Sequence, residues 1–331
     1  MTHGISGILF AGAAEPDQLQ LFEGSIDMSK LRKKVEQMTA HNSPATRKAY
    51  ASDWKDWLGW CAVAGRCPLP ANGDDVACYI AHNIEELGLA VSTQERRLAA
   101  IVGAHRAAGG KVNTERARRV LSGALRAGYA QPQGKKALTV DELRRMVAAL
   151  PKTPLGVRDR ALLVFGFACG MRRSELVALD VADVHVSDKG VRVQVRRGKT
   201  DQDGHGREFG VFPGRRALSC PVLALKRWLK VRGAAPGPLF VSGSPAHHLT
   251  DKRLSDRAVY KLVRRSVASI GLNPDDYGGH SLRAGMVTAA AESGVPESMI
   301  MHVTGHRSIA MVAKYVRPAR IWAYNPLAKA L

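Results

Sequence analysis

The chain has 331 residues, which is long enough for two domains that each bury a core of their own. Lysine and arginine number 49 against 29 aspartate and glutamate residues, so the formal net charge at pH 7 is +20. Solubility alone needs a much smaller imbalance, and the excess favours a polyanionic partner, nucleic acid first. No apolar run reaches the ~20 residues of a membrane span, so we expect no membrane partner.

The five cysteines are odd in number and show no CxxC pairing. We therefore expect reduced thiols in a cytoplasmic protein, associated with the nucleoid if the polyanion is DNA. An apolar stretch at 4–14 lacks a basic flank and runs into Glu15 and Asp17, so a secretory signal is not expected.

Residues 1–43 show no sustained periodicity, and we interpret them as an N-terminal arm. Residues 44–129 predict an all-helical domain. Its first helix begins at Ser43 and Pro44, a cap followed by proline at the first helical position, and has apolar residues at spacings of three and four. The starts of the other three helices are expected at Asp74, at Ser92 and Thr93, and near Asn113.

Basic side chains lie off the apolar faces of these predicted helices, where they could contact DNA in a major groove. An exposed arginine on a helix is more often simply solvated, so these residues are candidates only. They are Arg47, Lys48, Arg96, Arg97 and Arg106, and we also expect His105 on the outer face of the third helix.

Residues 130–137 are polar and contain helix breakers, which predicts an interdomain linker whose Lys135 and Lys136 are candidates for phosphate contact. Residues 138–331 form the second predicted domain. It begins with Thr139 and Glu142, at the spacing of a helix capping box.

Strict alternation at 191–195 predicts a strand, and 207–212 is a plausible partner across a glycine-containing turn. The short apolar segment 238–241 predicts an edge strand or a buried loop. Ser219 and Ser255 are expected to cap the helices that follow them, and Arg257 on a polar face of the second helix is a further candidate for DNA contact.

Four short motifs hold side chains suited to phosphate chemistry. The first is an arginine at a helix stop with a glutamate that starts the next helix, and the second is a lysine entering the hairpin turn beside Arg197. The third is a histidine and an arginine three residues apart on one helical face, and the fourth is a histidine at a turn with a tyrosine nine residues later. In that order the residues are Arg172 and Glu175, Lys199, His280 and Arg283, and His306 and Tyr315. Each motif alone has an ordinary structural explanation, so their order in one basic chain carries the prediction.

This motif set resembles the tyrosine recombinases, the phage-integrase family of site-specific DNA recombinases. The family pattern is an Arg in a G-x-R-x-x-E context, a Lys in a β-hairpin, H-x-x-R, and G-H or G-W followed by a Tyr, and the resemblance covers residues 44–331. The H-S-x-R-x-G form at 280–285 is most similar to Cre-type members. His306 departs from the Trp of those members and agrees with the wider family.

The resemblance implies a mainly α fold with a small β-sheet: an all-helical N-terminal core-binding domain plus an α+β catalytic domain, closed as a clamp around duplex DNA. It implies a double-stranded DNA site with inverted repeats, and a homotetramer that exchanges strands through a Holliday junction. The apolar tail at 318–331, which Pro318 is expected to separate from the preceding helix, would pack into a neighbouring protomer, with docking on its own domain as the alternative.

The implied chemistry fits the residue types. Tyr315 would attack the phosphodiester and hold the DNA as a 3′-phosphotyrosine, while His280 manages its proton. Lys199 would protonate the leaving 5′-oxygen as general acid. Charge on the non-bridging oxygens would be bound by Arg172, Arg283 and His306, with Glu175 in support. The sequence has no visible carboxylate cluster, so we expect no metal and no cofactor.

The sequence is also compatible with two other functions. A type IB topoisomerase shares the nucleophile and the basic residues but relaxes supercoils as a monomer; the G-H-x-S-x-x-M spacing before Tyr315 and the helical first domain argue against it. A DNA-binding regulator with a vestigial site is the non-enzymatic alternative, which the intact catalytic set disfavours and which trapping of covalent DNA would test.

Overall fold

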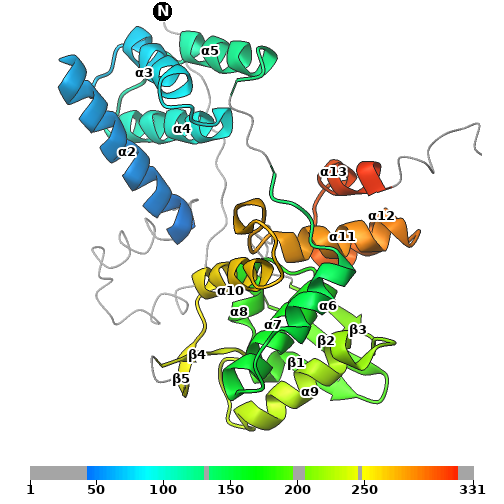
Figure 1. Ribbon diagram of the computed structural model, residues 1–331. Helices are drawn as coiled ribbons and strands as arrows, with labels where there is room; N and C mark the ends of the chain where they lie inside the picture. The colour runs from blue at the N-terminus through cyan, green and yellow to red at the C-terminus, as the bar shows by residue number, and fades with distance from the viewer. Residues whose placement is uncertain (1–42, 130–133, 197–205, 245–247, 320–331) are drawn as a thin grey trace, which may run out of the picture. The chain divides into compact units, whose positions relative to one another are not determined.

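The computed structural model describes residues 43–129, 134–196, 206–244 and 248–319. The chain divides into two compact units, Met1–Gln133 and Gly134–Leu331. Both are built mainly from α-helices, and the small sheets belong to the second unit (Figure 1). The predicted fold class is thereby confirmed. Among the described helices, none is long and apolar enough to cross a membrane.

The first unit contains four described helices that pack in two pairs, α2 on α4 and α3 on α5. Trp57, Tyr79, Ile80 and Ile101 are fully buried between them. The helices are α2 (Pro44–Ala64), α3 (Gly73–Glu85), α4 (Val91–Ala107) and α5 (Glu115–Arg126).

The caps of these helices differ in part from the sequence-based expectation. Ser43 caps α2 as predicted, because its hydroxyl accepts a bond from the Thr46 N–H. Helix α3 starts earlier than Asp74, since the Asn72 side chain accepts from the Asp74 N–H at 2.9 Å. Helix α4 begins at Val91 after an Ala90 that makes no side-chain cap, so Ser92 lies inside the helix.

The second unit begins with the predicted capping box. Thr139 accepts from the Glu142 N–H at 3.1 Å, and the Glu142 carboxylate accepts from the Thr139 N–H at 2.8 Å. The helices of this unit are α6 (Val140–Ala148), α7 (Pro154–Cys169), α8 (Arg173–Ala178), α9 (Pro221–Arg232), α10 (Asp256–Ala268), α11 (Ser281–Glu292), α12 (Glu297–Thr304) and α13 (Ile309–Ala319). Short 3-10 turns lie at η2 (Val181–Asp183), η3 (Ala217–Ser219) and η4 (Pro274–Asp276).

Two antiparallel sheets accompany these helices. The first has the order β1-β2-β3, and its central Val193 pairs with Val184 on one side and Phe209 on the other. It comprises β1 (Val184–Ser187), β2 (Gly190–Val195) and β3 (Arg207–Val211), so the predicted strand pair is confirmed. The second sheet pairs β4 (Val241–Gly243) with β5 (Leu249–Arg253).

Two predicted helix boundaries in this unit are wrong. Ser219 lies in η3, and the residue that caps α9 is Cys220, whose Sγ accepts from the Leu223 N–H. Pro318 does not end the helix that carries Tyr315, because α13 continues to Ala319. A proline so near the end removes only a last-turn hydrogen bond, which a helix tolerates.

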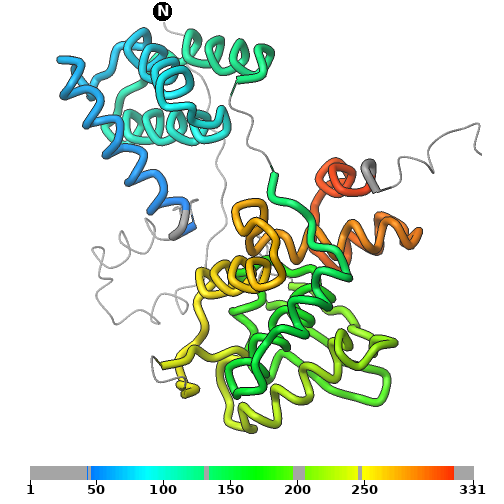
Figure 2. Tube along the Cα trace, in the orientation of Figure 1, coloured from blue at the N-terminus to red at the C-terminus, as the bar shows by residue number. Residues whose placement is uncertain are grey.

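Helix α7 forms the centre of the second unit. It is buried on nearly all sides, and it packs against α9 and α11. Helix α13 lies across α11 and α12 (Figure 1). It is held there by Val312 and Val316, which pack on Val287, Ala291 and Ile300. The chain path in Figure 2 shows how the turn after α7, the start of α11 and the turn before α13 come from distant parts of the sequence.

Candidate active site

Arg172 lies at the turn between α7 and α8, where the sequence predicts a helix stop. Gly170 ends α7 in a left-handed conformation with a φ of 53°, and Arg172 occupies the N-cap position of α8. Its Nη1 atom lies 2.6 Å from Glu175 Oε1, and its Nη2 atom donates to the Gly305 carbonyl at 3.3 Å. The predicted pairing of Arg172 with Glu175 is therefore present.

Arg207, at the first position of β3, completes this cluster. Its Nη2 atom donates to Glu175 Oε2 at 2.7 Å, and its Nε atom donates to the Val303 carbonyl at 3.1 Å. The side chains of Glu175 and Arg207 are only 2% and 12% exposed. The buried Glu175 carboxylate thus binds Arg172 before α8 and Arg207 on β3, and Arg207 in turn bonds to the end of α12.

Arg283 lies on α11 and is 2% exposed. Its Nη1 atom donates to the carbonyl oxygens of Gly170 at 2.8 Å and Thr304 at 2.5 Å. Its Nη2 atom is buried and has no hydrogen-bond partner in the described structure. A buried N–H of a charged group without an acceptor is costly, so this atom points to a site for an oxygen ligand.

His280 and Tyr315 meet although they are 35 residues apart in the chain. The His280 Nε2 atom lies 2.8 Å from the Tyr315 hydroxyl oxygen. His280 precedes the first residue of α11, whereas Tyr315 lies on α13. The phenol can therefore donate its proton to an imidazole nitrogen without any rearrangement.

His306 lies between α12 and α13. Gly305 ends α12 with a φ of 66°, and the His306 Nδ1 atom lies 2.7 Å from Thr304 Oγ1. Lys199 and Arg197 lie outside the described residues, between β2 and β3. Within the described ranges, the structure thus brings together Arg172, Glu175, His280, Arg283, His306 and Tyr315.

The electrostatics of this site favour an anion. Loss of surrounding water lowers the pKa of His280, and the charges of Arg283, Arg172 and Arg173 lower it further. Burial, together with Arg283 and Arg172, lowers the pKa of His306 to about 4. Burial raises the pKa of the Tyr315 phenol, and Arg283 opposes that shift. The site therefore holds excess positive charge around a phenol that needs a base.

The basic candidates on the first unit fall into two groups. Arg47, Lys48 and Arg106 are exposed, so they remain available for DNA. Arg96 donates to Asp53 at 2.8 and 2.9 Å. Arg97, at 12% exposure, pairs with Asp56 at 2.9 Å.

The expectation that Arg97 and His105 lie outside is wrong. Arg97 is held against the Tyr79 ring, and its guanidinium is neutralised by Asp56. His105 is buried: its Nε2 atom accepts from the Ala71 N–H, and its Nδ1 atom donates to the Ile101 carbonyl. Both side chains hold the helices together.

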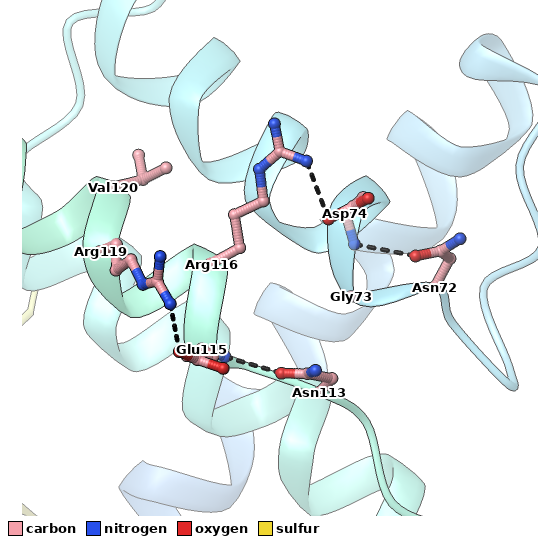
Figure 3. A pocket seen from close by; sticks show the side chains of 8 residues that line it. All are labelled: Asn72, Gly73, Asp74, Asn113, Glu115, Arg116, Arg119 and Val120. Carbon is pink, nitrogen blue, oxygen red and sulfur yellow. Dashed lines mark hydrogen bonds and ion pairs between the residues drawn. The ribbon is translucent and has the colours of Figure 1, made fainter.

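A pocket of about 700 Å³ lies between the N-termini of α3 and α5 in the first unit (Figure 3). Arg116 and Arg119 line it, but each has an acidic partner, Asp74 at 3.0 Å for Arg116 and Glu115 for Arg119. These pairs offset the charge of both arginines, so the pocket lacks the excess positive charge found around Arg283.

The basic candidates of the linker and of α10 differ in their surroundings. Lys135 lines a hollow of about 440 Å³ together with Arg172, Arg173, Tyr260 and His280. Lys136 is bonded to Asp276 at 2.8 Å, and Arg257 is exposed on α10. Among the described residues, no group of three or more His, Cys, Asp or Glu side chains could hold a metal ion.

The sequence model of the phage integrase family matches residues 136–320, a range that contains every catalytic residue predicted above. The chain belongs to the phage integrase family. It is 33% identical over 304 residues to an integrase/recombinase xerD homolog of Selenomonas ruminantium, which covers 90% of this chain and 88% of the relative. It is a site-specific tyrosine recombinase.

Solved structures of phage integrase family members share the fold. The Tn1549 transposon integrase in complex with transposon right end DNA matches 89% of this chain and 98% of its own, with 15% identity and a TM-score of 0.62. A lambda integrase tetramer bound to a Holliday junction matches 87% of this chain and 76% of its own, with 17% identity and a TM-score of 0.57.

Sequence reasoning missed two residues of this integrase site, Arg207 and Thr304. Arg207 opens strand β3, after the segment that holds Lys199, and its partner Glu175 lies 32 residues away in the sequence. Thr304 sits two residues before His306, where a hydroxyl can reach an imidazole. The two-residue spacing of Thr304 and His306 is thus a local signal that could have indicated Thr304, whereas the contact of Arg207 has none.

Proposed function

We propose that the protein cuts and rejoins duplex DNA at a specific site through a 3′-phosphotyrosine on Tyr315. The observation that carries this proposal is the Tyr315 hydroxyl bonded to His280 beside a buried arginine, Arg283, with an unpartnered Nη2 atom. A phosphodiester oxygen is the ligand that would satisfy Arg283. The phenol then faces the phosphorus as nucleophile.

Cleavage moves two protons and exchanges one bond to phosphorus. Tyr315 gives its proton to His280 Nε2, and its oxygen forms a bond to phosphorus. The bond from phosphorus to the 5′-oxygen breaks, and the leaving oxygen takes a proton from Lys199. Arg172, Arg283 and His306 bind the charge on the non-bridging oxygens. Because the ester keeps the bond energy, a 5′-hydroxyl can reverse the step without ATP.

We also propose that four protomers assemble on two inverted-repeat sites. The lambda integrase tetramer on a Holliday junction supports this arrangement by analogy of fold. Exposed apolar residues on α12 and α13, Met299, Ile309 and Met311, offer a surface for an apolar segment of a neighbouring protomer. The tail at 320–331 lies outside the described residues and is the proposed occupant. With DNA as substrate, a nucleoid-associated location in the cytoplasm follows.

Trapping of covalent DNA tests the proposal without knowledge of the target site. The protein is incubated with a library of nicked duplexes that have a randomised central segment, and protein-linked DNA is recovered after denaturation. The wild-type protein should yield adducts whose DNA converges on an inverted repeat. Tyr315→Phe should keep DNA binding and yield none. Binding without any adduct from the wild type would indicate a regulator. Adducts without sequence convergence, together with relaxation of a separate supercoiled plasmid, would indicate a topoisomerase.

A further inference from the structure

Thr304, the last residue of α12, is fully buried and has two close polar neighbours. Its Oγ1 atom lies 2.6 Å from the Ile300 carbonyl oxygen and 2.7 Å from His306 Nδ1. A hydroxyl group has one proton to donate, so it can donate to only one of the two. The other neighbour must donate a proton to Thr304 Oγ1, because otherwise two lone pairs would face each other.

Only one arrangement gives every close pair a proton. The Ile300 carbonyl oxygen has no proton, so if Thr304 donated to His306, two oxygens would face each other at 2.6 Å in a buried site. Thr304 therefore donates to Ile300, as a helical threonine commonly does four residues back, and it accepts the His306 Nδ1–H. In a neutral imidazole the other nitrogen, Nε2, then carries a lone pair.

The surroundings of His306 are mainly positive. The charged and titratable groups that act on His306 come from several elements: Arg283 on α11 and His280 before it, Arg172 before α8, and Arg207 on β3. Glu175 pairs with Arg172 and Arg207, and Tyr315 bonds to His280. Glu175 is already shared by two arginines, so it offers no counter-charge to the imidazole. Burial and the arginine charges keep the pKa of His306 near 4, so His306 is neutral at pH 7 in the free protein.

We propose that Thr304 is a positioning residue that fixes His306 in its Nδ1–H form, so that Nε2 can donate to a phosphate oxygen only after His306 takes up a proton from solvent. The inference rests on the proposed function for the phosphate it names. A phosphodiester brings one negative charge into a site of excess positive charge, and that charge favours the imidazolium form. His306 is then a donor only when the substrate is present.

The tautomer can be measured directly in the free protein. Nitrogen-15 NMR of histidine-labelled protein distinguishes a protonated Nδ1 from a protonated Nε2, and loss of one signal set in His306→Gln assigns His306. We expect the Nδ1–H form in the wild type and in Thr304→Ser, and a majority of the Nε2–H form in Thr304→Val. An Nε2–H form in the wild type would overturn the proposal, and that spectrum is decisive even if the Val variant does not fold.

The pH dependence of cleavage provides the second test. In Thr304→Ser, His306 can donate from Nε2 only when it is protonated, whereas in Thr304→Val the neutral Nε2–H form can donate at any pH. On the duplex recovered from covalent adducts, the adduct-forming rate of Thr304→Ser divided by that of Thr304→Val should therefore fall as pH rises. The fall should reach about tenfold per pH unit above the pKa of DNA-bound His306. A purely structural role would give a ratio independent of pH and would overturn the proposal. Absence of any wild-type adduct would refute the proposed function instead, while leaving the tautomer measurement intact.

Discussion

Glu175 is a buried carboxylate that two arginines share. Burial alone would raise the pKa of this carboxyl, but the hydrogen bonds and charges of Arg207 and Arg172 outweigh burial and hold the pKa below its ordinary value. The ionised carboxylate therefore stabilises the fold above the ordinary glutamate pKa of about 4.3, and this contribution is lost as pH falls through the lowered folded-state pKa.

Arg207→Met should destabilise the second unit by about 3 kcal/mol at pH 7, because it leaves a buried carboxylate with one partner fewer. Arg192 on the adjacent strand is a matched control: its side chain is 63% exposed, and Arg192→Met should change the unfolding free energy by less than about 0.5 kcal/mol. Urea unfolding measures both. The deficit of Arg207→Met should shrink as pH is lowered below about 4, and a deficit that stays constant would contradict the shared-carboxylate account.

Lys199→Ala should cleave the ordinary duplex very slowly, because the leaving 5′-oxygen needs a proton. It should cleave a duplex with a 5′-bridging phosphorothiolate at nearly the wild-type rate, since a thiolate leaves without one. Single-turnover adduct formation on both substrates measures this. Equal defects on the two substrates would remove Lys199 from the role of general acid and make Lys136 and Arg197 the next candidates.

Helix α11 positions two residues of the site through its close packing. It carries Arg283 and starts beside His280. Gly285 on α11 is the point where this helix lies against the backbone of Leu138. A Cβ atom at position 285 would overlap the Leu138 carbonyl oxygen and press on the Phe167 ring. Gly285 therefore permits the close approach of α11 to the Leu138 backbone, and this approach fixes the position of the start of α11.

Gly285→Ala should destabilise the protein by about 1–3 kcal/mol and reduce adduct formation, because α11 must move to relieve the overlap. Gly123 on α5 is a matched control, since a Cβ atom there meets nothing within 4 Å. Gly123→Ala should be neutral or stabilising by up to about 1 kcal/mol. Thermal denaturation compares the two variants, and equal behaviour would show that the approach at Leu138 is not limiting.

Local patterns predicted the elements that have local causes. Ser43, Thr139 and Ser255 cap their helices as expected, and alternation identified β2 and β3. Strands β1 and β5 were not predicted, because they are short and mostly not buried. The start of α4 could not be located from a cap, because Ala90 makes no side-chain cap.

The motif residues of the site were found because their spacing is a property of the sequence. Arg207 was missed because its bond to Glu175 joins residues 32 apart, and only the folded chain shows it. Arg97 was misplaced for the same reason, since its partner Asp56 lies on another helix. The direction of a long side chain on a half-buried helix face depends on residues of other helices, which the apolar periodicity of its own helix does not reveal.

For the whole molecule, the tail at 320–331 is proposed to couple the position of Tyr315 to a neighbouring protomer. Deleting 320–331 should leave a folded protein that binds one half-site normally but binds two half-sites without cooperativity and forms no synaptic complex. Gel-shift titration on one-half-site and two-half-site duplexes measures this. Unchanged cooperativity would mean that the tail docks on its own domain.

The net charge of +20 bears on every DNA measurement, because phosphate contacts by lysine and arginine make affinity depend steeply on salt. We therefore expect the affinity for DNA to fall steeply as the salt concentration rises.

The proposed function depends on a covalent bond between Tyr315 and a 3′-phosphate of DNA. Adducts trapped from the duplex library are digested with nuclease and protease, and mass spectrometry locates the nucleotide on the protein. We expect a nucleotide linked through its 3′-phosphate to Tyr315 in the peptide from α13, and none in Tyr315→Phe. A nucleotide on any other residue, or one linked through a 5′-phosphate, would contradict it.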